Sequence, residues 1–123
     1  MFNFEKLEVW QKAIDFVDLL YKETQSFPSE ERFGLTNQLR RAAVSISSNI
    51  AEGSSRSSKT DFARFTEIAA GSVFETVSQA FIARRQSFFT EEQFREIYAN
   101  AEQLSRMLSG LRKSLLSTLN PQL

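Results

Sequence analysis

The stretch SSNIAEGSSR, residues 47–56, ends one predicted helix and turns the chain into a second, longer one. Asn49 in this stretch falls beside an apolar stripe, where a core-facing helix normally carries an apolar side chain. Gly53 is expected to end the helix, because glycine adopts the left-handed C′ conformation most readily. The stripe itself recurs at spacings of four, three, four and four, the pattern of an amphipathic helix, at Leu35, Leu39, Ala42, Ile46 and Ile50.

Helical periodicity covers the rest of the chain as well. We expect helices over about 5–24, from a start between 30 and 36 up to 53, over 58–86, and from 90 onward. Pro28 separates the first two, with a possible extra turn at 29–33, because proline disfavours helical geometry in the residue before it. The capping-box patterns Ser58-x-x-Asp61 and Thr90-x-x-Gln93 mark the last two starts. Residues 120–123 are expected to fray.

Two neighbouring apolar stripes run along the first predicted helix, and two more run along the third. In the first helix, one stripe is Leu7, Trp10, Ile14, Val17 and Tyr21, and its neighbour is Val9, Ala13, Phe16 and Leu20. No strand-like alternation is present. Four helices joined by short loops therefore predict an all-α fold, an up-down-up-down antiparallel four-helix bundle that forms one domain over residues 1–123.

Composition narrows the classes of function. The 123 residues include no cysteine and no histidine, which removes the thiolate nucleophile, the commonest general base and the commonest transition-metal ligands. Carboxylates spaced along helices, Asp15 with Asp18 and Glu92 with Glu96, lack the histidine partners of di-metal bundles. We therefore expect no enzyme activity, no metal, no cofactor and no small-molecule substrate.

The N-terminal sequence lacks the features of a signal peptide, and no apolar run approaches the roughly 20 residues of a membrane helix. These features predict a cytoplasmic protein without membrane contact. The net charge is zero, yet it is unevenly distributed. Residues 1–31 hold three lysines and seven acidic residues, whereas residues 32–64 hold six basic and two acidic ones.

Basic side chains on either side of the 47–56 stretch are the first candidate site. They could meet phosphates along one edge, with the serine-rich loop adding further donors. The alternative is a solvated face, or one that pairs with the acidic N-terminal third of another subunit, because the sequence shows no exposed aromatic ladder for base stacking. The candidates for nucleic-acid binding are Arg40, Arg41, Arg56, Lys59 and Arg64.

A polar cluster across the second and third helices is another candidate. Asn49 needs a hydrogen-bond partner within this cluster or at a backbone carbonyl. The cluster could hold a small ligand or an ion, but we favour a structural role in fixing helix register, with Arg40 or Arg56 balancing Glu52. Its members are Ser45, Ser48, Asn49, Glu52, Gly53, Ser72 and Glu75.

The third predicted helix has an apolar arc wider than one bundle core requires. Extended apolar patches on such proteins often mark partner surfaces, although the arc could also mean that this helix is the most buried one of a monomer. The predicted oligomer interface consists of Phe74, Val77, Phe81 and Phe88.

A family resemblance extends over nearly the whole chain, and the block Asn49 to Gly53 is its most specific part. The chain resembles the small four-helix-bundle proteins encoded in intervening sequences of bacterial large-subunit ribosomal RNA genes, to which the accessory protein of diversity-generating retroelements is also similar. This resemblance implies a ring-shaped homopentamer and no settled biochemical activity. Flanking residues that carry it are Leu7, Val9, Trp10, Ala13, Leu35, Gln38, Arg40, Arg41, Ala42, Ser45, Ile46, Arg56, Phe62, Phe65, Ala69, Gly71, Ser72, Glu75 and Gln79.

From the sequence we therefore expect a non-catalytic, self-assembling protein that presents a basic face to RNA or DNA. The alternative is a purely structural or protein-binding homo-oligomer without affinity for nucleic acid. Salt separates the two, because it would weaken polyanion binding in the first and subunit association in the second.

Overall fold

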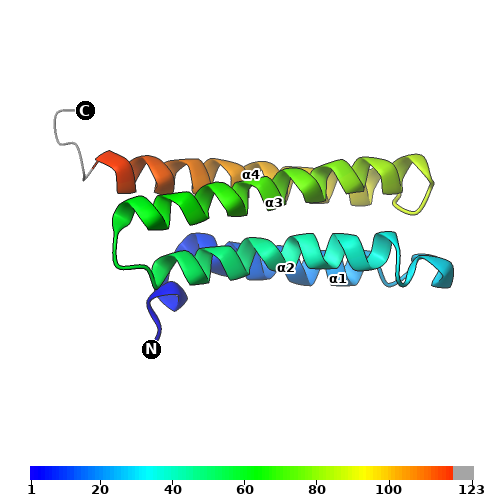
Figure 1. Cartoon of the computed structure of the whole chain (residues 1–123). Coiled ribbons are helices and arrows are strands. Elements are labelled where there is room, and N and C mark those ends of the chain that lie inside the picture. The colour runs from blue at the N-terminus through cyan, green and yellow to red at the C-terminus, as the bar shows by residue number, and fades with distance from the viewer. Residues whose placement is uncertain (118–123) are drawn as a thin grey trace.

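Four long helices dominate the computed structural model, which describes residues 1–117 (Figure 1). A short 3-10 turn, η1 (Asn3–Lys6), precedes α1 (Glu8–Glu23), and a second turn, η2 (Ser29–Glu31), precedes α2 (Leu35–Ser54). The two longest helices are α3 (Lys59–Arg85) and α4 (Glu91–Ser117). The predicted all-α fold is therefore confirmed, while the expected fraying of residues 120–123 lies outside the described residues.

The helices run alternately up and down, and each packs against the next, with α4 closing back onto α1 (Figure 1). The α1–α2 and α3–α4 turns lie at one end of the bundle, and the N-terminus and the α2–α3 turn lie at the other. This is the predicted up-down-up-down antiparallel four-helix bundle. Since α2 packs against α1 on one side and α3 on another, its remaining side faces away from the core, and we call this side the outer flank of α2.

Local sequence signals set several helix boundaries. The Ser58 hydroxyl accepts a hydrogen bond from the amide of Asp61 at 3.1 Å, which caps α3. At α4 the capping box is complete, since the Thr90 amide donates to Gln93 Oε1 at 2.8 Å and the Gln93 amide donates to Thr90 Oγ1 at 3.1 Å. Each bond satisfies an amide that lacks a partner within its helix. Both predicted starts are confirmed.

The core is formed by one apolar stripe from each helix. On α1 the buried stripe is Val9, Ala13, Phe16 and Leu20, so the neighbouring stripe that ends at Tyr21 is half-buried or exposed. The main stripe predicted on α3 is buried from Phe65 onward, while its first residue, Phe62, is half-buried; its members are Phe62, Phe65, Ala69, Ser72, Val73, Thr76, Ala80 and Ala83. These contributions meet α2 and α4 in a single continuous cluster. Two stripes on one helix look alike in sequence, and only packing decides which of them faces inward.

Gly53 does not end α2, and this prediction was wrong. The helix continues to Ser54, and none of the glycines among the described residues has a positive φ. Gly53 is buried, and a Cβ atom at this position would lie 2.7 Å from Phe65 Cβ and 2.8 Å from Phe62 Cδ1. Glycine is therefore needed here because α3 passes very close to α2. The left-handed C′ position is found instead at Ser87, after α3, with a φ of 63°.

Replacing Gly53 with alanine should therefore destabilise the fold by about 1–3 kcal/mol, because Phe65 Cβ is fixed to the backbone and α3 must move to make room. The matched control is Gly110→Ala on α4, since a Cβ at Gly110 meets no atom within 4 Å. That substitution should stabilise the helix by up to about 1 kcal/mol. Urea-induced unfolding at one protein concentration measures both. An alanine tolerated equally well at both positions would contradict the close approach of α2 and α3.

Candidate nucleic-acid interface

A shallow cleft follows the outer flank of α2, beginning at the α1–α2 turn. Its basic side chains are Arg32, Arg40 and Arg41, and no carboxylate is among the residues that line it. Two aromatic rings, Tyr21 and Phe33, lie beside these arginines. The remaining lining residues are the aliphatic Val44 and four small or polar ones, Thr36, Asn37, Ser45 and Ser48. We call this surface the α2 cleft. Three positive charges without a counter-charge make it electrostatically attractive to anions.

Arg40 connects α2 to the end of α1. Its Nε donates to Thr24 Oγ1 at 2.9 Å, and its guanidinium carbon lies 4.4 Å from the centre of the Tyr21 ring. The Thr24 hydroxyl in turn donates to the Leu20 carbonyl at 2.6 Å, so it is used as both donor and acceptor. A cation beside the C-terminal carbonyls of α1 also suits the helix dipole. Arg40 is therefore partly committed to the fold.

Arg32 and Arg41 are less constrained. Both are exposed, and neither forms an ion pair within residues 1–117. The Arg32 guanidinium carbon lies 5.3 Å from the centre of the Phe33 ring, within the range of a cation–π contact. Phe33 itself is 85% exposed. Arg32 and Arg41 can therefore contact a ligand without breaking an ion pair within residues 1–117.

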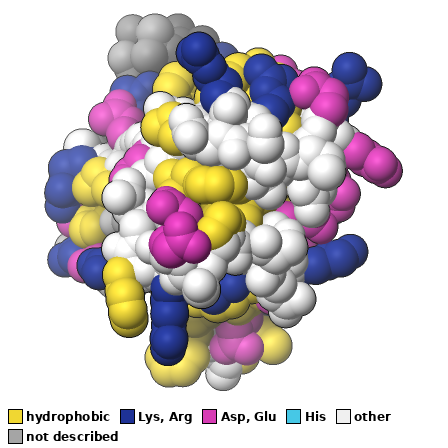
Figure 2. Space-filling model, turned by 90° about the vertical axis from the view of Figure 1, so that its right-hand side faces the viewer, with side chains coloured by type: hydrophobic (Ala, Val, Ile, Leu, Met, Phe, Trp, Pro, Cys, Tyr) yellow, Lys and Arg dark blue, Asp and Glu magenta, His cyan; other side chains and the backbone are white. Residues whose placement is uncertain are grey.

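Figure 2 views the bundle end-on, from the side where the α1–α2 and α3–α4 turns lie, and shows apolar, basic and acidic side chains exposed together. The α2 cleft begins at this end, because its first lining residues come from the end of α1 and from the α1–α2 turn.

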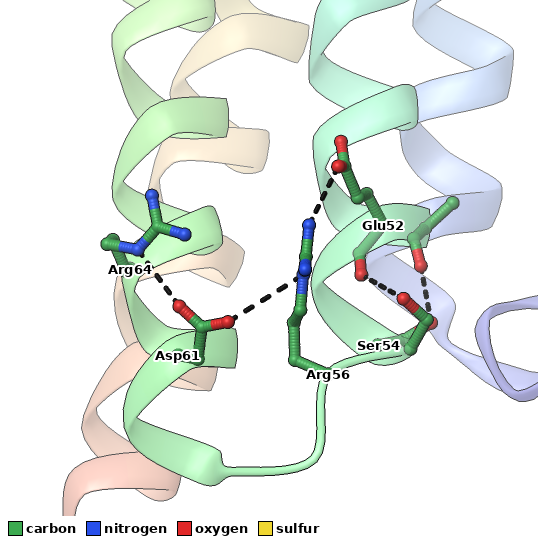
Figure 3. A network of polar contacts seen from close by, with 7 residues as sticks. Glu52, Ser54, Arg56, Asp61 and Arg64 are labelled. Carbon is green, nitrogen blue, oxygen red and sulfur yellow. Dashed lines mark hydrogen bonds and ion pairs between the residues drawn. The ribbon is translucent and has the colours of Figure 1, made fainter.

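The α2–α3 turn presents a different electrostatic environment (Figure 3). The Arg56 guanidinium lies 2.8 Å from a Glu52 carboxylate oxygen and 3.7 Å from Asp61. Arg64 pairs with the same Asp61 at 2.9 Å. Both guanidiniums also lie 4.6 Å from the centre of the Phe65 ring. Two of the three basic residues at this turn are therefore paired within the chain, and Lys59 alone is exposed without an ion pair in residues 1–117.

The five predicted nucleic-acid residues thus fall into two groups. Arg40 and Arg41 belong to the α2 cleft, whereas Arg56, Lys59 and Arg64 surround the α2–α3 turn. At about 1.5 Å per helical residue, the groups are separated by roughly 20 Å along the bundle. The structure does not bring them together into one basic face, because the part of α2 from Arg41 to Ser54 lies between them.

The predicted polar cluster is present in a smaller form. The Ser45 and Ser72 hydroxyls lie 2.9 Å apart and join α2 to α3. Asn49 Nδ2 donates to the Ser45 carbonyl at 2.8 Å and to the Ser45 hydroxyl at 3.0 Å. The expectation that Asn49 finds a partner in the cluster or at a backbone carbonyl is therefore confirmed in both ways. The arrangement joins α2 to α3 through hydrogen bonds between the protein's own side chains.

Two carboxylates and one hydroxyl lie outside this network. Glu52 is exposed and pairs with Arg56, while Glu75 is exposed and accepts a hydrogen bond from Gln79 Nε2 at 3.2 Å. Ser48 lines the α2 cleft instead. The cluster therefore lacks the acidic groups that an ion site would need. Among residues 1–117, moreover, no three carboxylates are grouped so that they could hold a metal ion.

The predicted interface residues differ in their exposure. Phe74 is 69% exposed, and Phe81 is also exposed although its ring packs edge-on against Phe94 with centres 4.8 Å apart. Val77 lies deeper, in a groove between α3 and α4. Phe88 is half-buried against Phe27, with ring centres 5.4 Å apart. Only the first two present large apolar surface to the outside, and Ile68 and Ile82 on the same helix add to it.

Sequence reasoning missed several residues of the α2 cleft. In the sequence, Tyr21 belongs to one of the two apolar stripes of the first helix, and no pattern marks Arg32, Phe33 or Asn37 as site residues. A signal for Phe33 was available, because this aromatic residue lies between Arg32 and Gly34 in a turn and belongs to no periodic stripe. An aromatic residue that no helix face requires deserves a separate explanation.

The class of protein follows from these observations: an all-α four-helix bundle with an arginine-lined cleft along one helix. The chain matches the sequence profile of the 23S rRNA-intervening sequence protein family over residues 5–110, and it belongs to that family. This confirms the resemblance drawn from the sequence. None of the described helices combines the length and apolar character needed to cross a membrane.

A solved structure with a similar fold is that of a protein of unknown function from the S23 ribosomal protein family of Bacteroides thetaiotaomicron VPI-5482. The two chains are 25% identical, with a TM-score of 0.76. The similarity covers 85% of this chain and 98% of the other. No curated protein matches the chain.

The hydroxyl pair between α2 and α3 should be measurable as a coupling energy. In a double-mutant cycle of Ser45→Ala and Ser72→Ala, we expect a favourable interaction of about 0.5–1.5 kcal/mol, the usual net value of such a hydrogen bond. Ser48→Ala, at an exposed position on the same helix, should change the free energy of unfolding by less than about 0.5 kcal/mol. Strictly additive effects of the two core-facing substitutions would show that the pair does not hold the helices in register.

Proposed function

We propose that this protein is a non-catalytic nucleic-acid-binding protein and that the α2 cleft is its binding surface. The observation that carries the proposal is the charge of the cleft: three arginines and no carboxylate among its lining residues. Phosphates are recognised mainly by arginine and lysine side chains, and each neutralised phosphate adds affinity through counterion release. Asn37 and Ser48 add polar groups that can position a backbone.

The cleft is a better candidate than the α2–α3 turn. Arg56 and Arg64 at the turn already pair with Glu52 and Asp61, so a phosphate there must compete with two carboxylates. Arg32 and Arg41 have no such competitor within residues 1–117. Of the five residues proposed from the sequence, the binding surface therefore keeps Arg40 and Arg41 and gains Arg32, while Arg56, Lys59 and Arg64 at the α2–α3 turn are left out.

RNA is a natural ligand to test first. The family is named for sequences that intervene in 23S rRNA, and the solved relative belongs to a ribosomal protein family. Both descriptions concern those proteins and not a measured activity of this chain, so duplex DNA belongs in the same experiment.

Replacing Arg32 and Arg41 together with alanine should weaken binding to labelled structured RNA and reduce the slope of log K against log salt by about 2, one unit for each lost phosphate contact. The control removes two exposed positive charges from α4, as Arg106→Ala with Lys113→Ala, and should leave the affinity nearly unchanged. Titrations at several salt concentrations measure both. Equal losses in the two variants would show that net charge alone drives binding, and no binding by the unaltered protein at low salt would refute the proposal.

A second proposal, self-assembly, has its own support in the outer face of α3. Four large apolar side chains are exposed on this helix, at Ile68, Phe74, Phe81 and Ile82. Gly71 lies between the first two, at an exposed mid-helix position where a Cβ would meet open space. Glycine there lowers helix stability and no contact within the chain requires it, whereas a closely packed second copy would. We propose that copies of this chain associate through this face, in a ring of five as the resemblance implies.

Phe74→Glu should convert the assembly to monomer, because a carboxylate would be buried at the contact between copies. The bundle itself should keep its stability, since Phe74 is 69% exposed within one copy. Ser114→Glu, exposed near the end of α4, is the matched control and should leave the assembly intact. Sedimentation velocity gives the mass of each. An unaltered protein that is monomeric, or a Phe74→Glu variant that keeps its full mass, would rule out this face.

A further inference from the structure

Phe33 is the most exposed aromatic side chain of the described residues, and the fold does not use it. Its exposed fraction of 85% exceeds that of Phe2, at 72%, and of Phe74. Phe27, which also lies between α1 and α2, is buried and packs edge-on against Phe89, with ring centres 4.8 Å apart. An exposed phenyl ring in a turn gains nothing from the hydrophobic effect. Its position beside the α2 cleft offers a reason for its presence.

We propose that the α2 cleft binds unpaired, single-stranded nucleic acid, with a base stacked on the Phe33 ring. This inference rests on the proposed nucleic-acid binding and narrows it to one class of ligand. Grooves that bind single strands combine positive charge along the backbone with aromatic rings on which bases stack, and arginine adds cation–π contacts. All of these elements are present, with Phe33 and Tyr21 as the rings and Arg32, Arg40 and Arg41 as the charges.

The geometry favours a single strand over a duplex. Bases in a duplex are already stacked on one another, so they cannot cover an exposed ring without being flipped out. The phosphates of a duplex need only the arginines and leave Phe33 in water. An unpaired base can cover the ring while the neighbouring phosphates meet Arg32 and Arg41. The two ring–guanidinium contacts, 5.3 Å for Arg32 with Phe33 and 4.4 Å for Arg40 with Tyr21, place charge and ring side by side.

The length of the cleft suits a short segment. From Asn37 to Ser48, both of which line it, the helix rises about 16 Å. Stacked nucleotides are spaced by about 3.4 Å along one strand, so about five of them fit beside α2. A strand of ten nucleotides is therefore a sufficient probe.

The test compares three labelled probes at low salt: a ten-nucleotide oligouridine, a ten-base-pair RNA duplex and a ten-unit abasic strand that carries phosphates without bases. Oligothymidine serves as the DNA arm. We expect the oligouridine to bind more tightly than the other two RNA probes. Phe33→Leu should weaken oligouridine binding about tenfold and leave duplex binding unchanged, because it removes the ring and keeps an apolar side chain. Phe33→Trp should retain the affinity, and exposure of the site predicts unchanged melting temperatures for both variants.

The outcomes separate the two proposals. If duplex and single strand bind alike, both are lost in the Arg32→Ala/Arg41→Ala variant, and Phe33→Leu has no effect, then the preference for single strands is overturned while nucleic-acid binding at the cleft stands. If no probe binds at low salt, both proposals fail. If the only ligand found is a second copy of the chain, the cleft is a contact between subunits and both proposals fail.

Discussion

The close contact between α2 and α3 is the constraint on which the rest of the bundle depends. At Gly53 the two helices approach so closely that a single methyl group would collide with the Phe65 side chain. About two turns earlier on α2, the Ser45 hydroxyl meets that of Ser72, and Asn49 holds the serine from its own helix. Small residues allow the helices to approach closely, and the hydroxyl pair joins them. The packing of α2 against α3 and α1 decides which of its residues face outward.

One consequence is the orientation of the charged side chains on α2. With one side committed to α3 and another to α1, the remaining flank carries Arg41, Asn37 and Ser48 outward. The contact between Arg40 and Thr24 then fixes the end of α1 beside this flank and brings Tyr21 to it. At the other end of α2, the same helix carries Glu52 toward Arg56, so the positive charge of that arginine is paired within the chain. The distribution of ion pairs, more than the number of arginines, distinguishes the two ends.

The parts of the structure that could be predicted from the sequence are those with local causes. Periodic apolar residues gave four helices, and the hydroxyl and amide groups at Thr90 and Gln93 marked a helix start through bonds only three residues apart. The role of Gly53 could not be read in this way, because it depends on which residue of α3 faces it. The exposure of Tyr21 could not be predicted for a related reason: both stripes on α1 are apolar in sequence, and packing buries the other one. Of the candidate site, Arg40 and Arg41 were predicted, but Phe33 was not, because it belongs to no periodic pattern. The ion pairs of Arg56 with Glu52 and of Arg64 with Asp61 could not be predicted either, because they depend on side-chain geometry.

The central claim, that nucleic acid is bound along the outer flank of α2, is tested most directly by ultraviolet crosslinking to a labelled oligouridine, followed by mass spectrometry of the linked peptides. This measurement locates the contact without altering the protein. The account predicts crosslinks at Phe33 or Tyr21, the two rings that line the cleft. Crosslinks confined to the segment that contains Phe62 and Phe65, beside the α2–α3 turn, would contradict it. They would place the nucleic-acid site at Arg56, Lys59 and Arg64 instead.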